Sequence, residues 1–281
     1  MSSPPIQWYP GHIAKAEKAL LEQLKRVDVV LEVRDARIPL STHHPQVDQW
    51  IGEKGRILVM NRVDMIPPKA KEQWTQWFQD RGEDPLFTDA QHGKGIDAIA
   101  KATQTAGAHM NQRRLDRGML PRPVRAVVIG FPNVGKSALI NRLLKRRVVE
   151  SARRAGVTRQ LRWVRISDQI ELLDAPGVLP NKLTDQQAAI KLAICDDIGE
   201  AAYDNQRVAA SLVDLLPLSS AVLESRYGIA IANLTGESYL KTLADSKYNG
   251  DVERTARQIL TDFRKGNLGA IALELPPNKS I

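Results

Sequence analysis

The stretch GFPNVGKS at residues 130–137 constrains the fold of this chain more than any other feature. It matches the pattern GxxxxGK[S/T], follows the apolar run RAVVI and precedes the helix-like segment SALINRLL. A glycine-rich loop between a strand and a helix surrounds phosphate groups with backbone N–H groups at the positive end of the helix. The sequence therefore predicts a nucleotide site in which Lys136 reaches the β- and γ-phosphates and Ser137 ligates Mg²⁺. The other residues predicted to contact the nucleotide here are Asn133, Val134, Gly135 and Ala138. The alternative is a glycine-rich turn that binds no nucleotide.

Two further segments fit the phosphate end of such a site. In LLDAPG at 172–177, Asp174 ends an apolar run, where its carboxylate can hold Mg²⁺ through water, and the Gly177 N–H can contact a γ-phosphate. Thr158 in GVTR is the one threonine between 138 and 174, and its hydroxyl is predicted to ligate Mg²⁺ in the triphosphate state. The alternative for Thr158 is an ordinary loop threonine.

A base-reading segment, NRVD at 61–64, follows the apolar run RILVM. The Asp64 carboxylate is predicted to accept the N1–H and N2–H of guanine, while Asn61 supports the loop and Val63 lies within it. Arg62 replaces the lysine of the usual NKxD pattern, and its aliphatic stem can still pack on the base. Some 25 residues later, FTDAQHGKGI is similar to the SAKxGxGI loop whose backbone N–H contacts the guanine oxygen. Asp89 stands there in place of the serine, and Ala90 is retained.

Both base-reading segments precede the phosphate-binding segments, which is the reverse of the usual order. Circular permutation is the simplest account, because the contacts of a sheet core do not depend on where the chain is cut. Apolar runs typical of strands alternate with helix-like segments up to about residue 180. The strand-like runs are 27–33, 56–61, 85–90, 124–130, 161–166 and 169–175, and the helix-like segments are 14–26, 68–80, 95–110 and 136–146. The predicted fold class is α/β, a doubly wound, mostly parallel sheet over residues 1–180, with a smaller all-helical domain over 181–281.

The charge distribution indicates a polyanionic partner. The chain has 40 Lys+Arg against 32 Asp+Glu, and residues 113–165 contain 15 basic residues with only Asp116 and Glu150 as acids. We expect RNA to be the partner of this basic segment and expect no DNA partner; the alternative is a solvated charged face. A single cysteine, a start without a long apolar stretch and no bilayer-length apolar run predict a cytoplasmic protein without a membrane partner.

Three more segments carry a resemblance over almost the full length. They are WYPGHIAKA at 8–16, EVRDARIP at 32–39 and DFRKGNLGAIALE at 262–274. Together with the motif order, they resemble the circularly permuted GTPases and, among these, the ribosome biogenesis GTPase A (YlqF) family. The resemblance implies a Ras-like permuted G domain that hydrolyses GTP to GDP and a helical RNA-binding domain. It also implies a role in late maturation of the large (50S) ribosomal subunit, with rRNA bound in the GTP state and release on hydrolysis. We expect a monomer off the ribosome.

The hydrolytic groups depart most from the usual GTPase pattern. Val178 occupies the position of the water-orienting glutamine of Ras-type enzymes, so slow turnover alone and stimulation by the ribosomal subunit are expected. His12 is the candidate catalytic group that the resemblance implies, beside Lys136 and Thr158; the alternative is a helix cap or a packing group. Asn133 occupies the position that helps bind K⁺ in related GTPases, so K⁺ is a candidate cofactor, although the amide can instead serve its own backbone.

Other interpretations of the chain stay open at this point. One is an RNA-binding scaffold whose bound nucleotide is not hydrolysed, and another is a P-loop enzyme that uses ATP. Asp35 and Arg37 are predicted to form a structural turn. His43 and His44 lack the further ligands of a zinc site and are predicted to be loop residues.

Overall fold

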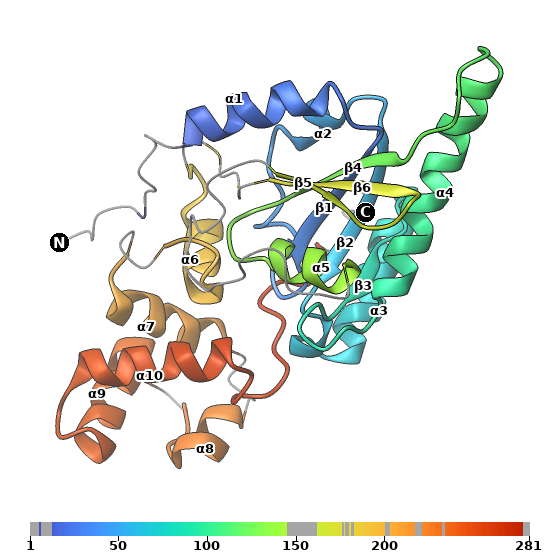
Figure 1. The fold of residues 1–281 in the computed structure, drawn as a ribbon. Helices are drawn as coiled ribbons and strands as arrows, with labels where there is room; N and C mark the ends of the chain where they lie inside the picture. The colour runs from blue at the N-terminus through green and yellow to red at the C-terminus, as the bar shows by residue number, and fades with distance from the viewer. Residues whose placement is uncertain are drawn as a thin grey trace.

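The computed structural model describes residues 6, 13–144, 162–175, 177, 180, 183–199, 203–216, 221–231 and 234–277. Every statement about the fold concerns these residues. Figure 1 shows a layered sheet part and, beside it, a group of helices formed by the later part of the chain.

The sheet has six strands in the order β3-β2-β1-β4-β6-β5. All neighbouring pairs are parallel except β5 and β6, which are antiparallel. The two central strands are rich in Val, Ile and Leu because both of their faces are covered, as parallel sheets require. The predicted α/β class and mostly parallel sheet are confirmed. The strands are β1 (Val29–Asp35), β2 (Gly55–Asn61), β3 (Leu86–Thr88), β4 (Val124–Ile129), β5 (Arg162–Arg165) and β6 (Ile170–Asp174).

Helices cover both faces of the sheet. Alternate residues of β1 belong to different clusters: Leu31 lies in the cluster with α4 and α5, and Val30 lies in the cluster with α1 and α2. Helix α3 packs on the second face through Trp74, against Leu58 and Met60. The helices of this part are α1 (Ile13–Leu24), α2 (Val47–Ile51), α3 (Pro68–Gln79), α4 (Ile96–Leu115) and α5 (Lys136–Leu143), with a 3-10 turn η2 (Val63–Met65). Helix α2 was not anticipated from the sequence.

After β6 the described residues contain helices and no strand. Four of the five helices begin at a side chain that accepts a hydrogen bond from the first turn: Asp185, Asp204, Thr235 and Asp251. Their core is continuous with that of the sheet part, since Leu192 and Phe263 share a cluster with Val33. Residue 180 remains our proposed boundary between the two parts. The helices are α6 (Gln186–Cys195), α7 (Asn205–Leu215), α8 (Val222–Tyr227), α9 (Gly236–Lys247) and α10 (Val252–Arg264). No helix in the described ranges is long and apolar enough to cross a bilayer.

The segment after α10 returns to the sheet part. The Ile271 N–H donates to the Met65 carbonyl at 2.8 Å, and the Leu273 N–H donates to the Arg37 carbonyl at 3.0 Å. The Glu274 carboxylate accepts the Leu40 N–H at 2.8 Å, and the Glu274 carbonyl accepts the Trp74 indole N–H at 3.2 Å. Residues 271–274 therefore fasten the helical part to the ends of β1 and β2.

Candidate nucleotide-binding site

The base-reading segments and the described phosphate-binding segments meet at one edge of the sheet. Asn61 and Asp174 are the last residues of β2 and β6, and Gly130 directly follows β4. Because these strands are parallel, their carboxyl ends lie at the same edge, which is where open α/β sheets bind ligands. The reversed motif order therefore still produces one site.

At two positions in the loop of residues 130–135, only glycine accommodates the backbone conformation and the close neighbours. Gly130 has φ 149° and Gly135 has φ 103°. A Cβ at Gly130 would lie 2.3 Å from the Val33 carbonyl oxygen, and one at Gly135 would lie 2.1 Å from the Asn61 Nδ2. The loop thus packs directly on β1 and on the base-reading segment, and α5 begins at Lys136, in the strand–loop–helix arrangement that binds phosphate.

Two charged side chains at the phosphate end are buried with few groups that offset the cost of burying their charges. Lys136 is buried, and its Nζ donates to the carbonyls of Gly130 at 3.2 Å and Phe131 at 2.7 Å. Burial lowers the pKa of Lys136 to about 8, although the charge of Asp174 opposes this shift. Asp174 is 2% exposed, and its Oδ1 has no hydrogen-bond partner among the described residues. Burial raises the pKa of Asp174 to about 6, against the effect of Lys136. A buried carboxylate oxygen without a donor is a suitable acceptor for a hydrated cation.

Asn61 joins the two halves of the site. Its Nδ2 donates to the Val134 carbonyl at 2.7 Å, and its Oδ1 accepts the Ala90 N–H at 3.0 Å. The residue is 3% exposed, so both of its hydrogen bonds are sheltered from water. One side chain therefore holds the phosphate loop and the 89–90 loop against the end of β2, as the predicted supporting role requires.

Arg62 also bridges the two halves. Its Nη2 donates to the Asn133 carbonyl at 2.6 Å, and its Nε lies 3.5 Å from an oxygen of Asp35. Its backbone is left-handed, with φ 65°. The contact with the phosphate loop was not anticipated, because the sequence suggested only that the arginine stem could pack on the base.

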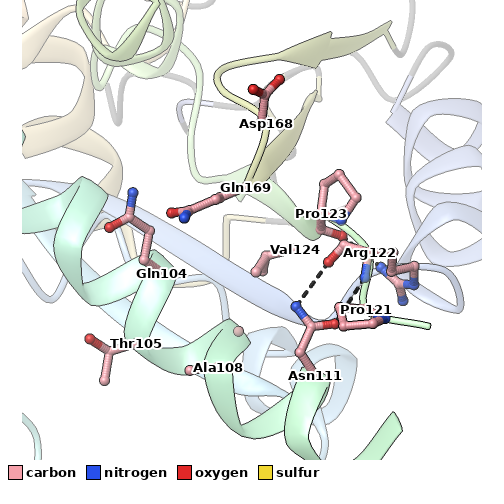
Figure 2. Close-up of a pocket in the computed structure, with 11 residues that line it drawn as sticks. Gln104, Thr105, Ala108, Asn111, Pro121, Arg122, Pro123, Val124, Asp168 and Gln169 are labelled. Atoms are coloured by element: carbon pink, nitrogen blue, oxygen red, sulfur yellow. Dashed lines mark hydrogen bonds between the residues drawn. The ribbon is translucent and has the colours of Figure 1, made fainter. Parts of the chain in front are cut away.

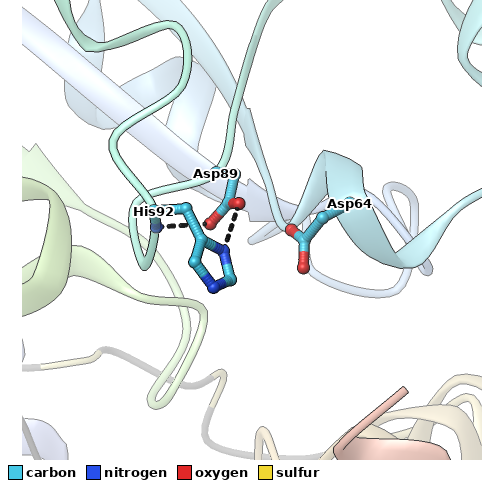
Figure 3. A group of neighbouring side chains, drawn as sticks. All are labelled: Asp64, Asp89 and His92. Carbon is cyan, nitrogen blue, oxygen red and sulfur yellow. Dashed lines mark hydrogen bonds and ion pairs between the residues drawn. The ribbon is translucent and has the colours of Figure 1, made fainter. Parts of the chain in front are cut away.

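Asp64 and Asp89 lie next to each other with different surroundings (Figure 3). Asp64 is exposed on η2, yet partial burial and the nearby Asp89 raise its pKa. Asp89 is 5% exposed and accepts the N–H groups of Gln91 at 2.9 Å and His92 at 3.0 Å. The His92 Nδ1 lies 2.6 Å from the second Asp89 oxygen. Asp89 therefore closes the loop that presents Ala90, and Asp64 is the carboxylate left facing outward.

A buried polar network lies behind the site, and the sequence predicted only part of it. Both Asp35 and Arg37 are fully buried, and Arg37 donates to the two Asp35 oxygens at 3.0 and 2.7 Å. Their predicted structural role agrees with this geometry, and Arg37 also donates to the Cys195 carbonyl at 3.2 Å. Asp197 was not anticipated: it is fully buried, neither carboxylate oxygen has a described hydrogen-bond partner, and burial raises its pKa well above the usual range. Nothing in the local sequence marks it.

The C-terminal end of α6 also touches the phosphate loop. The Asn133 Nδ2 donates to the Asp196 carbonyl at 2.6 Å, and Asn133 has φ 58°. Gly177 packs on the other side of the loop, since a Cβ there would lie 2.6 Å from the Pro132 nitrogen. The structure thus brings Gly177 against the phosphate loop, of which Asn133 is a part.

The remaining predicted residues have mixed positions. Val134 is buried in the loop, and Ser137 and Ala138 lie in the first turn of α5. His43 contacts Arg34, with 2.6 Å between Nδ1 and Nη2, and His44 stacks on Trp50 with ring centroids 4.2 Å apart, in agreement with their assignment as loop residues. His12, Thr158 and Val178 lie outside the described residues, as do residues 145–161 of the basic segment 113–165.

Comparison with known proteins agrees with the assignment of this region as a nucleotide-binding site. Residues 125–222 match the family model described as 50S ribosome-binding GTPase. The ribosome biogenesis GTPase A of Bacillus cereus is 34% identical over 96% of this chain and 94% of its own length. That of Priestia megaterium is also 34% identical, over 96% of this chain and 97% of its own length. The crystal structure of GNP-bound YlqF from T. maritima has the same fold, with a TM-score of 0.66 and 24% identity over 93% of this chain and 98% of that one.

The fold is accordingly that of a circularly permuted G domain, and the site is a guanine-nucleotide site. The identity extends over nearly the whole of both chains, so it covers the helical part as well as the sheet. This chain therefore belongs to the ribosome biogenesis GTPase A (YlqF) family.

Proposed function

We propose that this GTPase acts in late maturation of the large (50S) ribosomal subunit, binding rRNA in its GTP state and leaving after hydrolysis. The observation that carries the nucleotide part of the proposal is Asn61, whose two hydrogen bonds hold the phosphate loop and the base-reading loop in one site despite the reversed order. The match of residues 125–222 to a 50S ribosome-binding GTPase model supports the large subunit as the partner. We further propose that the protein is a cytoplasmic monomer off the ribosome.

The phosphate end supplies charge stabilisation. Lys136 now donates to two carbonyls of its own loop, and nucleotide binding would replace these with β- and γ-phosphate oxygens. Gly177 lies against Pro132, where its N–H can contact the γ-phosphate. Ser137, Thr158 and Asp174 would hold Mg²⁺, and the Asp174 Oδ1, which has no partner among the described residues, fits that role. When bound, Mg²⁺ neutralises charge that develops on the transferred phosphoryl group.

The attacking water needs an orienting group that Val178 cannot provide. We propose slow hydrolysis by the free protein and acceleration on the subunit, with His12 as the group brought into place. K⁺ near Asn133 is the second candidate. The Asn133 amide is bonded to the Asp196 carbonyl in this structure, so binding a cation would require that bond to open.

The nucleotide state can reach the helical part by two routes. The chain enters α6 soon after Gly177, and the C-terminal end of α6 contacts both Asn133 and Arg37. A change at the phosphate loop therefore acts directly on α6, which is the kind of coupling that GTPase switches use. We infer that affinity for rRNA follows the nucleotide through these contacts.

Multiple-turnover GTP hydrolysis, measured with and without purified large subunits, tests the proposal. We expect slow turnover alone, clear stimulation by large subunits and none by small subunits. Subunit binding without any GTP turnover would instead favour a scaffold with an unhydrolysed nucleotide. Displacement of bound GTP by an equal concentration of ATP would favour an ATP-using enzyme.

The role of His12 is tested by His12→Ala in single-turnover hydrolysis with saturating large subunits. A positioned acid–base or water-orienting group is worth roughly 10²–10⁴ in rate. We expect the variant to bind GTP and subunits nearly as wild type does but to lose most of the stimulated rate. A stimulated rate within about two-fold of wild type, on the scale where tenfold is 1.36 kcal/mol, would assign the activation to K⁺ or to the ribosome.

A further inference from the structure

Helix α4 carries a projecting end that the nucleotide site does not use. Its 20 residues make it about 30 Å long, and in Figure 1 its later turns and the loop that follows (green) stand away from the rest of the molecule. The helix ends in a turn at Gly118, which has φ 72°. The Met119 N–H donates to the Arg114 carbonyl at 2.9 Å, and the Arg114 Nε donates to the Leu120 carbonyl at 3.0 Å. Residues 113–120, here named the α4 tip, thus have a defined shape.

The α4 tip combines positive charge with exposed apolar surface. Arg113 and Arg117 are exposed, and neither they nor Arg114 forms an ion pair with any described residue. The tip also holds three of the large exposed apolar side chains of the described chain: Leu115 at 50%, Met119 at 39% and Leu120 at 83% exposure. A chain gains nothing in stability by exposing these groups together, so the combination indicates a binding surface.

An open hollow of about 590 Å³ lies at the base of the tip (Figure 2). Its floor is close-packed, because a Cβ at Gly107 would lie 1.8 Å from the Val124 Cγ2. Asn111 exchanges hydrogen bonds of 3.0 and 3.1 Å with the backbone of Arg122, whose guanidinium donates to Asp28 at 2.8 and 2.9 Å. The rim is therefore fixed before any ligand arrives.

Two side-chain amides face the hollow and can bond to a ligand. Gln104 on α4 and Gln169 at the turn between β5 and β6 point into the space between these elements, and neither amide has a hydrogen bond to a described residue. Each offers a donor pair and an acceptor, which suits the edge of a nucleobase. Asp168 at the rim is paired with Arg165 at 3.0 Å, which reduces its repulsion of an anionic ligand. The volume lies within the roughly 300–1,000 Å³ of ordinary ligand pockets.

The hollow lies at the opposite end of the strands from the nucleotide site. Val124 begins β4, and Gln169 immediately precedes β6, whereas the nucleotide site is formed where these strands end. A ligand at the hollow would therefore contact none of the residues that bind GTP. Its binding should be largely independent of the nucleotide.

We propose that the α4 tip and the hollow bind RNA, with the arginines on backbone phosphates and one unstacked nucleotide base in the hollow. RNA is favoured because sequence-reading contacts to RNA target splayed bases in loops and bulges, which need polar recesses of this kind beside cationic side chains. The α4 tip carries three arginines and one acid, Asp116, which disfavours a basic ribosomal protein. This inference rests on the proposed function: the tip contributes the same affinity in both nucleotide states, and release after hydrolysis comes from contacts elsewhere in the protein.

Two variants separate the two parts of the surface. Arg113→Ala/Arg117→Ala removes phosphate contacts, and Lys18→Ala/Lys69→Ala removes the same charge from exposed positions on α1 and α3 as the matched control. Binding of protein-free large-subunit rRNA is measured against salt concentration. For the tip variant we expect the slope of log affinity against log salt to fall by about 0.7–0.9 for every phosphate that the arginines no longer neutralise, and no such change for the control.

Gln104→Ala/Gln169→Ala tests the hollow. We expect roughly tenfold weaker RNA binding at one salt concentration, with an unchanged salt slope because no charge is removed. GTP affinity within about two-fold of wild type verifies that both double variants are folded, since a factor of two is under 0.5 kcal/mol.

The outcomes distinguish this inference from the function on which it rests. If the wild type binds neither rRNA nor large subunits in any nucleotide state, the proposed function is wrong. If the wild type binds and both variants bind as it does, only the assignment of this surface is wrong. Loss of subunit binding with unchanged binding to protein-free rRNA would show a protein partner and overturn the RNA proposal.

Discussion

The two ends of the nucleotide site differ in how completely the protein satisfies its own polar groups. At the guanine end, Asn61 and Arg62 donate to carbonyls of the phosphate loop, and the Met65 carbonyl accepts a hydrogen bond from Ile271. At the phosphate end, Lys136 and Asp174 are buried with pKa values shifted toward their neutral forms. The guanine end is thus part of the scaffold, whereas the phosphate end is held in a state that a ligand would improve.

This difference implies different costs of mutation. Residues at the guanine end should affect the stability of the nucleotide-free protein, except where they face outward as Asp64 does. Residues at the phosphate end should affect nucleotide binding and hydrolysis with little loss of stability.

The largest effect is expected for Lys136→Met. Removing a charged donor to the phosphates should lower the single-turnover rate roughly 10²–10³-fold, the cost of deleting one electrostatic stabiliser. The free energy of unfolding without nucleotide should change by less than about 1 kcal/mol, because loss of a desolvated ammonium offsets loss of two hydrogen bonds. Urea denaturation and rapid quench measure the two quantities. A large loss of stability would contradict the distinction between the ends.

Asn61→Ala should show the opposite pattern. It leaves the Val134 carbonyl and the Ala90 N–H buried without partners, at about 1–3 kcal/mol each, so we expect about 2–6 kcal/mol of lost stability without nucleotide. Asn111→Ala is a matched control, since it also removes two hydrogen bonds to backbone groups but at a half-buried position. Equal urea midpoints for the two variants would show that Asn61 is no more structural than a half-buried asparagine elsewhere.

Asp64→Asn tests the outward-facing part of the guanine end. Loss of one charge-assisted hydrogen bond is worth roughly 1.5–3 kcal/mol, or about ten- to a hundred-fold in GTP affinity. Xanthosine triphosphate should bind more tightly to this variant than to wild type. In this base an oxygen replaces the 2-amino group of guanine, and the new amide can donate a hydrogen bond to it. Stability should be kept, since Asp64 is exposed. Unchanged GTP affinity in a competition titration would remove Asp64 from base recognition.

The smallest effect concerns pH and Asp174. Its folded-state pKa of about 6 exceeds its ordinary value of 3.8, so the folded protein binds the extra proton between these values. Stability contributed by the protonated form is therefore lost as pH rises from about 4 to about 6. Asp174→Asn should lack this loss and be about 1–2 kcal/mol more stable than wild type above pH 6, within the limit of 1.36 kcal/mol per pKa unit. Parallel pH profiles of the two proteins in urea denaturation would refute the raised pKa.

The elements with strong local signals could be predicted from the sequence. The six strands, the phosphate loop at 130–137 and the support by Asn61 follow from apolar runs, glycine spacing and motif order. Helix α2 could not be predicted, because its five residues are too few for a periodic pattern. The hydrogen bonds of Arg62 with Asn133 and of Asn133 with Asp196 were also missed, since they join residues 71 and 63 positions apart. Such pairings depend on how the elements pack, and no local pattern encodes them.

The hydrogen bonds of residues 271–274 have a consequence for synthesis of the chain. The carbonyls of Met65 and Arg37 accept hydrogen bonds from Ile271 and Leu273, close to the last described residue. During translation, the base-reading turn and the end of β1 must therefore wait until residues 271–274 have emerged from the ribosome before they reach their final arrangement. Domains that complete early in synthesis can begin to work while the ribosome is still making the rest. This molecule, by contrast, gains a fully fastened guanine end only after the ribosome has made the whole helical part that separates Met65 from Ile271.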